Sequence, residues 1–143
     1  MTQYIDPDRD QFEAFKALDR DEPIQMLNLV RLRDNASYPK GHAMAEQGLS
    51  GADAYTNYGA ESGPVFSRVG GSILWRGAFQ TTLIGPSDEH WDHMFIAHYP
   101  TARAFFEMIT DPAYQKAVVH RQSAVETSRL IRCAPGKTGA LFG

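Results

Sequence analysis

The chain has 143 residues and a mass of 15.9 kDa, with 43% hydrophobic and 22% charged residues, which fits one packed domain rather than a disordered chain. Its 14 basic and 17 acidic residues give a net charge of -3, which argues against nucleic acid as a partner because nucleic-acid binders concentrate positive charge. The single cysteine, Cys133, excludes an internal disulfide framework and a cysteine-based zinc site.

Periodicity and turn signals predict alternating helices and strands along most of the chain. In chain order we expect a helix at 7–18, a strand at 24–33, a loop at 34–49, a helix at 50–69, strands at 72–84 and 91–99, helices starting at 101 and 112, a strand at 127–133 and a Gly-rich tail at 134–143. The loop at 34–49 has no clear period and is of the kind that covers a site.

Local signals mark several boundaries of these elements. Asp6 followed by Pro7 predicts the start of the first helix, and Ser50 with Asp53 has the form of a capping box. Gly77, inside the long strand at 72–84, predicts a bulge.

The order of elements predicts an α+β fold. Residues 23–133 give strand, helix, strand, strand, helix in two pieces, and strand, which is the split βαβ pattern of ferredoxin-like folds, here with an added N-terminal helix at 7–18. We therefore expect a single domain over 1–143 with a ferredoxin-like βαββαβ core. Right-handed crossovers place both long helices on the same face of the sheet.

The opposite face of that sheet is predicted to be apolar and uncovered. Met94 and Ile96 alternate with Phe95 and Ala97, so both faces of this strand carry apolar side chains. A second copy packed sheet to sheet covers such a face, and we expect a homodimer. The alternative is that the N-terminal helix folds over this face, although it is short and covers only part of it.

Six short motifs carry a resemblance to a known family. They are MLNL at 26–29, GG at 70–71, WD at 91–92, YPT at 99–101, DPAYQ at 111–115 and SRL at 128–130. Together they resemble domain-of-unknown-function family 1330 over roughly residues 23–133. The resemblance implies a dimeric α/β barrel, in a superfamily of cofactor-free monooxygenases, haem-degrading enzymes, isomerases and non-catalytic binding domains.

Neither a signal peptide nor a membrane span is predicted. The N-terminal residues are acidic, without a basic and then apolar segment, and no apolar run approaches the roughly 20 residues that cross a bilayer. We expect a cytoplasmic protein without membrane contact.

The segment around Asp92 and His93 resembles a metal site in composition, but strand geometry argues against one. These two side chains point to opposite faces, and His98 lies about 20 Å further along the strand, so only His90 and Asp92 could converge locally. Metal sites need three or four converging ligands. We expect neither a metal nor another cofactor.

Asn28 and His98 are the candidate catalytic residues. Asn28 is the one short polar residue in an apolar central strand, so it bonds either to backbone or to a ligand in the barrel pocket. His98 ends the third strand, where it is either an interface histidine or a proton carrier. If Phe95, Ala97 and Tyr99 face the helices, His98 faces the barrel.

Aromatic and basic side chains supply the candidate ligand contacts. Tyr55 and Tyr114 have helical spacing and are expected in the core, and Arg31 in a surface ion pair. The substrate-binding residues we expect are Tyr58, Trp75 and Arg121.

Two classes of function agree with these features. The first is a small cofactor-independent enzyme of oxygenase or isomerase type acting on a small organic molecule. The second is a non-catalytic dimeric module that binds a small ligand or acts under stress. Convergence of Asn28, His98 and a Tyr or Arg in one closed cavity favours the enzyme, whereas scattered positions favour the binding module.

Overall fold

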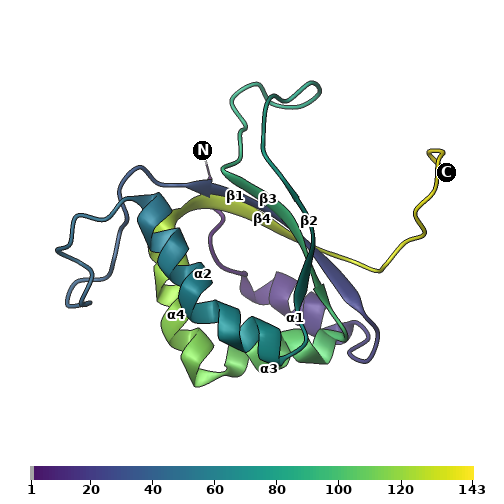
Figure 1. The fold of residues 1–143 in the computed structure, drawn as a ribbon, viewed down its shortest axis with the longest axis horizontal. Helices are drawn as coiled ribbons and strands as arrows, with labels where there is room; N and C mark the ends of the chain where they lie inside the picture. The colour runs from purple at the N-terminus through teal and green to yellow at the C-terminus, as the bar shows by residue number, and fades with distance from the viewer. Residues whose placement is uncertain (1) are drawn as a thin grey trace.

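The computed structural model describes residues 2–143 and forms one layer of sheet and one layer of helices (Figure 1). Its elements are α1 (Arg9–Ala17), β1 (Ile24–Leu32), α2 (Gly51–Arg68), β2 (Ser72–Gly77), β3 (His93–Tyr99), α3 (Ala102–Thr110), α4 (Pro112–Ala124) and β4 (Val125–Cys133). The predicted loop at 34–49 contains neither a helix nor a named strand.

The four strands form one antiparallel sheet in the order β2-β3-β1-β4. Helices α2, α3 and α4 cover one face of it (Figure 1). This is the ferredoxin-like topology, so the predicted fold class is confirmed.

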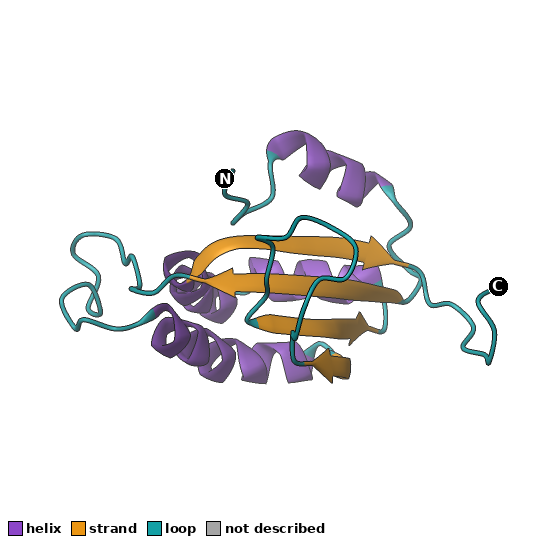
Figure 2. Cartoon of the chain, turned by 90° about the horizontal axis from the view of Figure 1, so that it is seen from above, coloured by secondary structure: helices purple, strands orange, loops and turns teal. Residues whose placement is uncertain are grey.

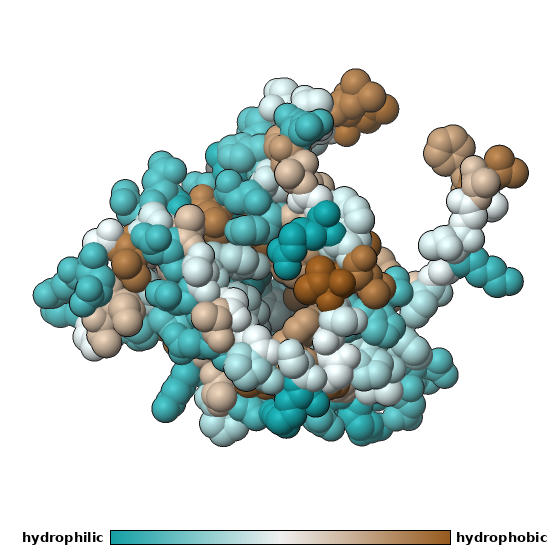
Figure 3. Space-filling view, viewed as in Figure 1, coloured by the Kyte–Doolittle hydropathy of each residue, from teal (hydrophilic) through white to brown (hydrophobic). Residues whose placement is uncertain are grey.

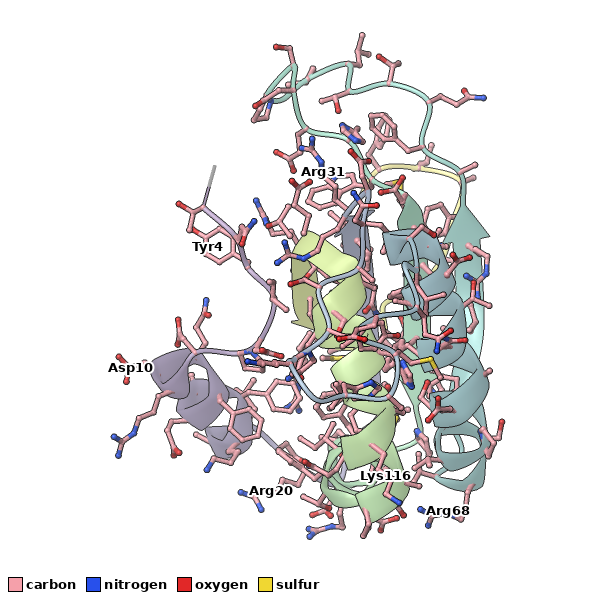
Figure 4. The ribbon with its side chains drawn as sticks, turned by 90° about the vertical axis from the view of Figure 1, so that its left-hand side faces the viewer. Tyr4, Asp10, Arg20, Arg31, Arg68 and Lys116 are labelled. Atoms are coloured by element: carbon pink, nitrogen blue, oxygen red, sulfur yellow. The ribbon has the colours of Figure 1, made fainter. Side chains whose placement is uncertain are left out.

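Helix α1 lies along the β4 edge of the sheet, not across its free face (Figure 2). The Phe15 ring lies 5.3 Å from that of Phe105 on α3, and Arg132 of β4 donates to the Asp19 carbonyl oxygen at 2.6 Å. Asp10 points away from the rest of the molecule (Figure 4). The alternative in which this helix covers the free face is therefore wrong.

Helix starts agree with the cap signals, with one correction. Ser50 and Asp53 form the predicted capping box at the start of α2. Helix α1 starts at Arg9 rather than at Pro7, because the Asp8 side chain, not that of Asp6, accepts the free backbone N–H of Gln11 at 2.8 Å.

Strand β2 ends at Gly77, so the predicted strand to position 84 is wrong. Gly77 pairs with Met94, and the chain before Met94 then turns towards β1: the Asp92 backbone N–H donates to the Val30 carbonyl oxygen, and an Asp92 carboxylate oxygen accepts from the Leu32 N–H. Beyond Gly77, β2 has no strand to pair with. The register shift in β2 also lies between Ile73 and Trp75, not at Gly77.

Alternate side chains of each strand form the core between sheet and helices, on what we call the covered face. Ile24, Met26 and Val30 of β1 are buried there, beside Ala97 and Tyr99 of β3. Their hydrocarbon surface, removed from water, is the main stabilising contribution in this layer.

The other face of the sheet, the open face, has no helix over it (Figure 1). Leu27, Met94 and Ile96 are half-buried there, while Trp75 keeps 46% of its surface exposed. Residues 78–92 form an arm that rises from this side, and the tail at 134–143 leaves the sheet at β4 (Figure 1). No helix among residues 2–143 is long and apolar enough to cross a membrane.

Candidate functional site

Polar and aromatic side chains gather on the covered face between α2 and the sheet. Asn28, Tyr55, Tyr58, His93 and Phe95, which we call the covered-face cluster, remain half-buried although neighbouring core residues are fully buried. Figure 3 shows this side of the molecule hollowed between α2 and the strands. Polar groups placed in an apolar layer are one feature of small-molecule sites. Two hollows, at the arm and beside Arg31, are lined by other residues.

His93 enters the cluster from the first position of β3. Its ring stacks on that of Tyr55, with centroids 4.7 Å apart and an interplanar angle of 21°. Burial lowers the pKa of His93 below its ordinary value, the Asp92 carboxylate opposes this, and the positive charge of Arg76 adds to the lowering. The imidazole is therefore neutral at pH 7 and can accept a proton.

Tyrosine hydroxyls from two helices form the wall opposite the sheet. The Tyr55 and Tyr58 ring centroids lie 5.5 Å apart, and the Tyr58 and Tyr114 hydroxyls share a hydrogen bond of 2.9 Å. Burial raises the pKa of Tyr55 and of Tyr114 far above the ordinary value, so both phenols stay protonated at neutral pH. Tyr114 is buried in the core as predicted, whereas Tyr55 belongs to the cluster.

Asn28 lies on the covered face, level with Phe95 of β3 and Leu130 of β4. Its side-chain amide donates to the Met26 carbonyl oxygen at 3.0 Å. This bond is the one that the structural interpretation of Asn28 predicts. An amide NH₂ carries two donor hydrogens, and contact between the second hydrogen and a ligand stays a prediction.

His98 lies on the open face, level with Gln25 and Ser72. Successive side chains of a strand alternate between faces, and Tyr99 and Ala97 occupy the covered side. The structure therefore does not bring His98 and Asn28 together. Within the described chain the His98 Nδ1 atom is buried without a hydrogen-bond partner.

The three predicted binding residues also divide between the two faces. Tyr58 belongs to the covered-face cluster. Arg121 lies close enough to Tyr55 for its charge to lower the Tyr55 pKa slightly, against the dominant effect of burial, but two of its N–H groups donate to the Ile5 carbonyl oxygen at 2.6 Å and the Ser128 hydroxyl at 3.1 Å. Trp75 lies on the open face, level with Ile96.

Sequence reasoning missed His93 and Tyr55 as partners of Asn28. His93 has the same parity as Phe95, Ala97 and Tyr99. If those three side chains face the helices, which is the condition under which His98 faces the barrel, then His93 faces the helices too. That signal was present, but His93 was considered only as a metal ligand. Among residues 2–143, no three His, Cys, Asp or Glu side chains come together as metal ligands.

A second group of side chains fixes the loop at 34–49. Tyr38 Oη lies 2.6 Å from Nδ1 of His120, a residue only 4% exposed, and His120 Nε2 lies 2.5 Å from a Glu61 carboxylate oxygen. The Tyr38 ring also stacks on His42, with centroids 4.8 Å apart. The loop is thus fixed on α2 and α4.

Arg31, outside this loop, pairs with Glu126 at 3.0 Å, which is the ion pair predicted for it.

Comparison with known proteins identifies the family. Residues 40–132 match the family described as Domain of unknown function (DUF1330). The chain belongs to this family. The resemblance seen in the sequence is therefore confirmed, although the matched region excludes the MLNL motif at 26–29 and includes part of the loop at 34–49.

One similar solved structure is the RPA0582 protein of unknown function from Rhodopseudomonas palustris. It is 56% identical, with a TM-score of 0.88 over 96% of this chain and 100% of that chain. The methylated form of RPA0582 gives a TM-score of 0.90 over 98% of this chain and 100% of that chain, also at 56% identity. These likenesses establish fold and family but no reaction.

A more distant neighbour is SnoaB, a cofactor-independent oxygenase from Streptomyces nogalater. It is 14% identical, with a TM-score of 0.49 over 82% of this chain and 96% of that chain. A likeness of this size carries no argument about activity. No curated protein matches the chain.

Proposed function

We propose that the protein is a homodimeric enzyme that moves a proton on a small organic molecule without a resident cofactor, as an isomerase or oxygenase does. The observation that carries this proposal is the desolvated His93 imidazole, stacked on Tyr55 beside the amide of Asn28 on the covered face. A neutral base next to a hydrogen-bond donor, in a partly accessible apolar layer, is suited to proton abstraction.

The supported step starts with a C–H group adjacent to a carbonyl. His93 takes the proton, the C–H electron pair moves to form an enolate, and the negative charge develops on the carbonyl oxygen. The free N–H of Asn28 donates to that oxygen, and the positive charges of Arg76 and Arg121 favour the anion. When a C=C bond is conjugated with the enolate, His93 returns the proton to the far carbon of that bond, the electron pair on the oxygen re-forms the carbonyl, and the shifted double bond completes an isomerisation.

The aromatic walls indicate the substrate class. Tyr55, Tyr58 and Phe95 offer rings from a helix and a strand, and the cluster contains no carboxylate. We therefore propose a planar or aromatic carbonyl compound, with Tyr58 retained from the sequence predictions as a contact and Arg121 as an electrostatic contributor. His98 and Trp75, on the open face, belong instead to the dimer part of the proposal.

The proposed homodimer packs the open faces of two copies against each other. Half-buried Leu27, Met94 and Ile96 form an apolar surface there, and the buried His98 Nδ1 lacks a partner within the described chain. A second copy covers this surface and supplies polar atoms from its own sheet. We expect about 2,000 Å² or more of total buried area, as in obligate dimers.

Deuterium exchange into an aromatic ketone, 1-tetralone, tests the proton step. We expect the wild-type protein in D₂O to accelerate replacement of the hydrogens adjacent to the carbonyl, measured by proton NMR. His93→Gln should reduce the acceleration at least 100-fold, because the base is lost. His98→Gln is the matched control and should retain the wild-type rate.

Equal exchange rates for the wild type and His93→Gln would contradict the assignment of the base. Binding of the ketone without exchange, measured by a raised melting temperature, would support the non-catalytic ligand-binding module instead. Asn28→Ala should lower the rate while leaving the dimer intact in light scattering.

A further inference from the structure

Two segments of the chain expose large apolar side chains almost completely. Leu83 and Ile84, at the tip of the 78–92 arm, are 91% and 92% exposed, and Leu141 and Phe142, near the end of the tail, are 88% and 115% exposed. Figure 3 shows these apolar groups at the ends of the two projecting segments. Within the described chain, neither group packs against the core, so each gains from contact with another surface.

The arm borders an open hollow beside the open face, with a volume of about 440 Å³. Its large apolar lining residues come from the arm and from β2 and β3; they are Trp75, Phe79, Leu83, Ile84, Trp91 and Met94. The hollow is large enough for a leucine and a phenylalanine side chain together.

The tail and the arm leave the sheet at opposite ends. Cys133, the last residue of β4, is level with Gln25, which in turn is level with His98 and Ser72 at the start of β2. The arm starts after Gly77, at the other end of β2, and six residues of strand separate the two ends by roughly 20 Å. The tail of a chain therefore leaves the sheet at the opposite end from its own arm (Figure 1).

A second copy packed on the open face brings a tail nearer to an arm than the two are within one chain. A two-fold axis that lies between the two sheets and runs across the strands reverses the strand direction of the second copy. That copy's tail then leaves its sheet at the same end as the first copy's arm, from the β4 edge, which lies three strand spacings, or about 14 Å, from β2. The eight residues from Cys133 to Leu141 reach at most about 29 Å, which is sufficient for this contact. The chain's own arm is also within that reach but farther away, so the disulfide experiment below distinguishes the two.

Charge supports the same pairing. Residues 78–92 contain the acidic residues Asp88, Glu89 and Asp92 and neither lysine nor arginine. The tail at 134–143 contains a single charged side chain, Lys137, which is basic. The two segments are thus complementary in both charge and hydrophobicity.

We propose that the tail of each chain docks into the arm hollow of the partner copy, with Leu141 and Phe142 as the residues that fill it. This inference rests on the proposed homodimer and adds an exchange of tails to it. The sheet-to-sheet contact covers Trp75 and Met94 at the base of the hollow, and the docked tail adds burial of Leu83 and Ile84 on the arm and of Leu141 and Phe142 on the tail.

Sedimentation equilibrium tests whether Leu141 and Phe142 stabilise the dimer. We expect the double variant Leu141→Ser with Phe142→Ser to raise the dimer dissociation constant at least tenfold, because two large apolar side chains lose their burial. Leu18→Ser, at a 53% exposed leucine at the end of α1, is the matched control and should leave the constant unchanged.

Disulfide trapping tests the direction of the contact. Cys133, which is exposed, is first replaced by Ser. Two single-cysteine proteins, one with Phe142→Cys and one with Leu83→Cys, are then mixed and oxidised, so that a bond between them joins two different chains. We expect this bond to form faster than the bond between Leu18→Cys and Leu83→Cys proteins.

Each outcome decides between the proposals. A wild-type monomer in sedimentation overturns the homodimer and the tail exchange together. A wild-type dimer whose dissociation constant is unchanged by the double variant overturns the tail exchange only. A bond that forms within one chain carrying both Phe142→Cys and Leu83→Cys, and not between chains, also overturns it.

Discussion

The two faces of the sheet have nearly the same hydrophobicity in the sequence but different roles in the structure. On β1, Met26 is buried under helices, while the adjacent Leu27 is half-buried on the open face. On β3, His93 stacks on a helix tyrosine, while His98 has none of the helices over it. The comparison shows that the helices, and not strand composition, turn one face into a core with a polar cluster.

The largest expected difference between the faces is in core packing. Met26→Ala should lower the free energy of unfolding by about 2–5 kcal/mol, because it leaves a cavity under the helices. Leu27→Ala should act mainly on the proposed homodimer, raising its dissociation constant. Urea denaturation at several protein concentrations separates the two effects. If the free energy of unfolding lost by Met26→Ala depended on protein concentration, the two faces would not differ in this way.

A smaller effect is expected at the tyrosine wall of the covered face. Tyr58→Phe removes the hydrogen bond to the Tyr114 hydroxyl and leaves that buried hydroxyl without this partner, so we expect a loss of about 1–3 kcal/mol. Tyr55→Phe, on the same helix, keeps the ring that stacks on His93 and should change stability by less than about 0.5 kcal/mol. Equal losses in the two variants would contradict the assigned hydrogen bond.

The smallest effect concerns pH. Because burial holds the pKa of His93 below its unfolded value of about 6.5, the unfolded state takes up this proton first as the pH falls. His93 therefore lowers stability progressively below about pH 6.5 and has no such effect above it. Melting temperatures at pH 7.5, 6.5 and 5.5 should fall less steeply for His93→Gln than for the wild type.

A melting-temperature slope for His93→Gln equal to that of the wild type would contradict the desolvation of His93.

Most of the fold could be predicted because its signals are local. Ser50 and Asp53 are three residues apart, so their capping box is visible in the sequence. The end of β2 could not be predicted, because it depends on Asp92 turning to bond with Val30 and Leu32, some sixty positions earlier in the chain. The sequence at 72–84 still looks like a strand beyond Gly77, although the chain that pairs with β2 has by then turned towards β1.

The candidate site depended on register in the same way. The sequence by itself determined the order of elements, the apolar character of both strand faces and the isolated polar position of Asn28. Only the tertiary structure decided that Asn28 is level with Phe95, and hence that His93 and not His98 shares its face. Side chains alternate with a period of two, so a shift of one residue between β1 and β3 exchanges the faces. No local interaction fixes that register, because it is set by how strands distant in sequence pack beneath the helices.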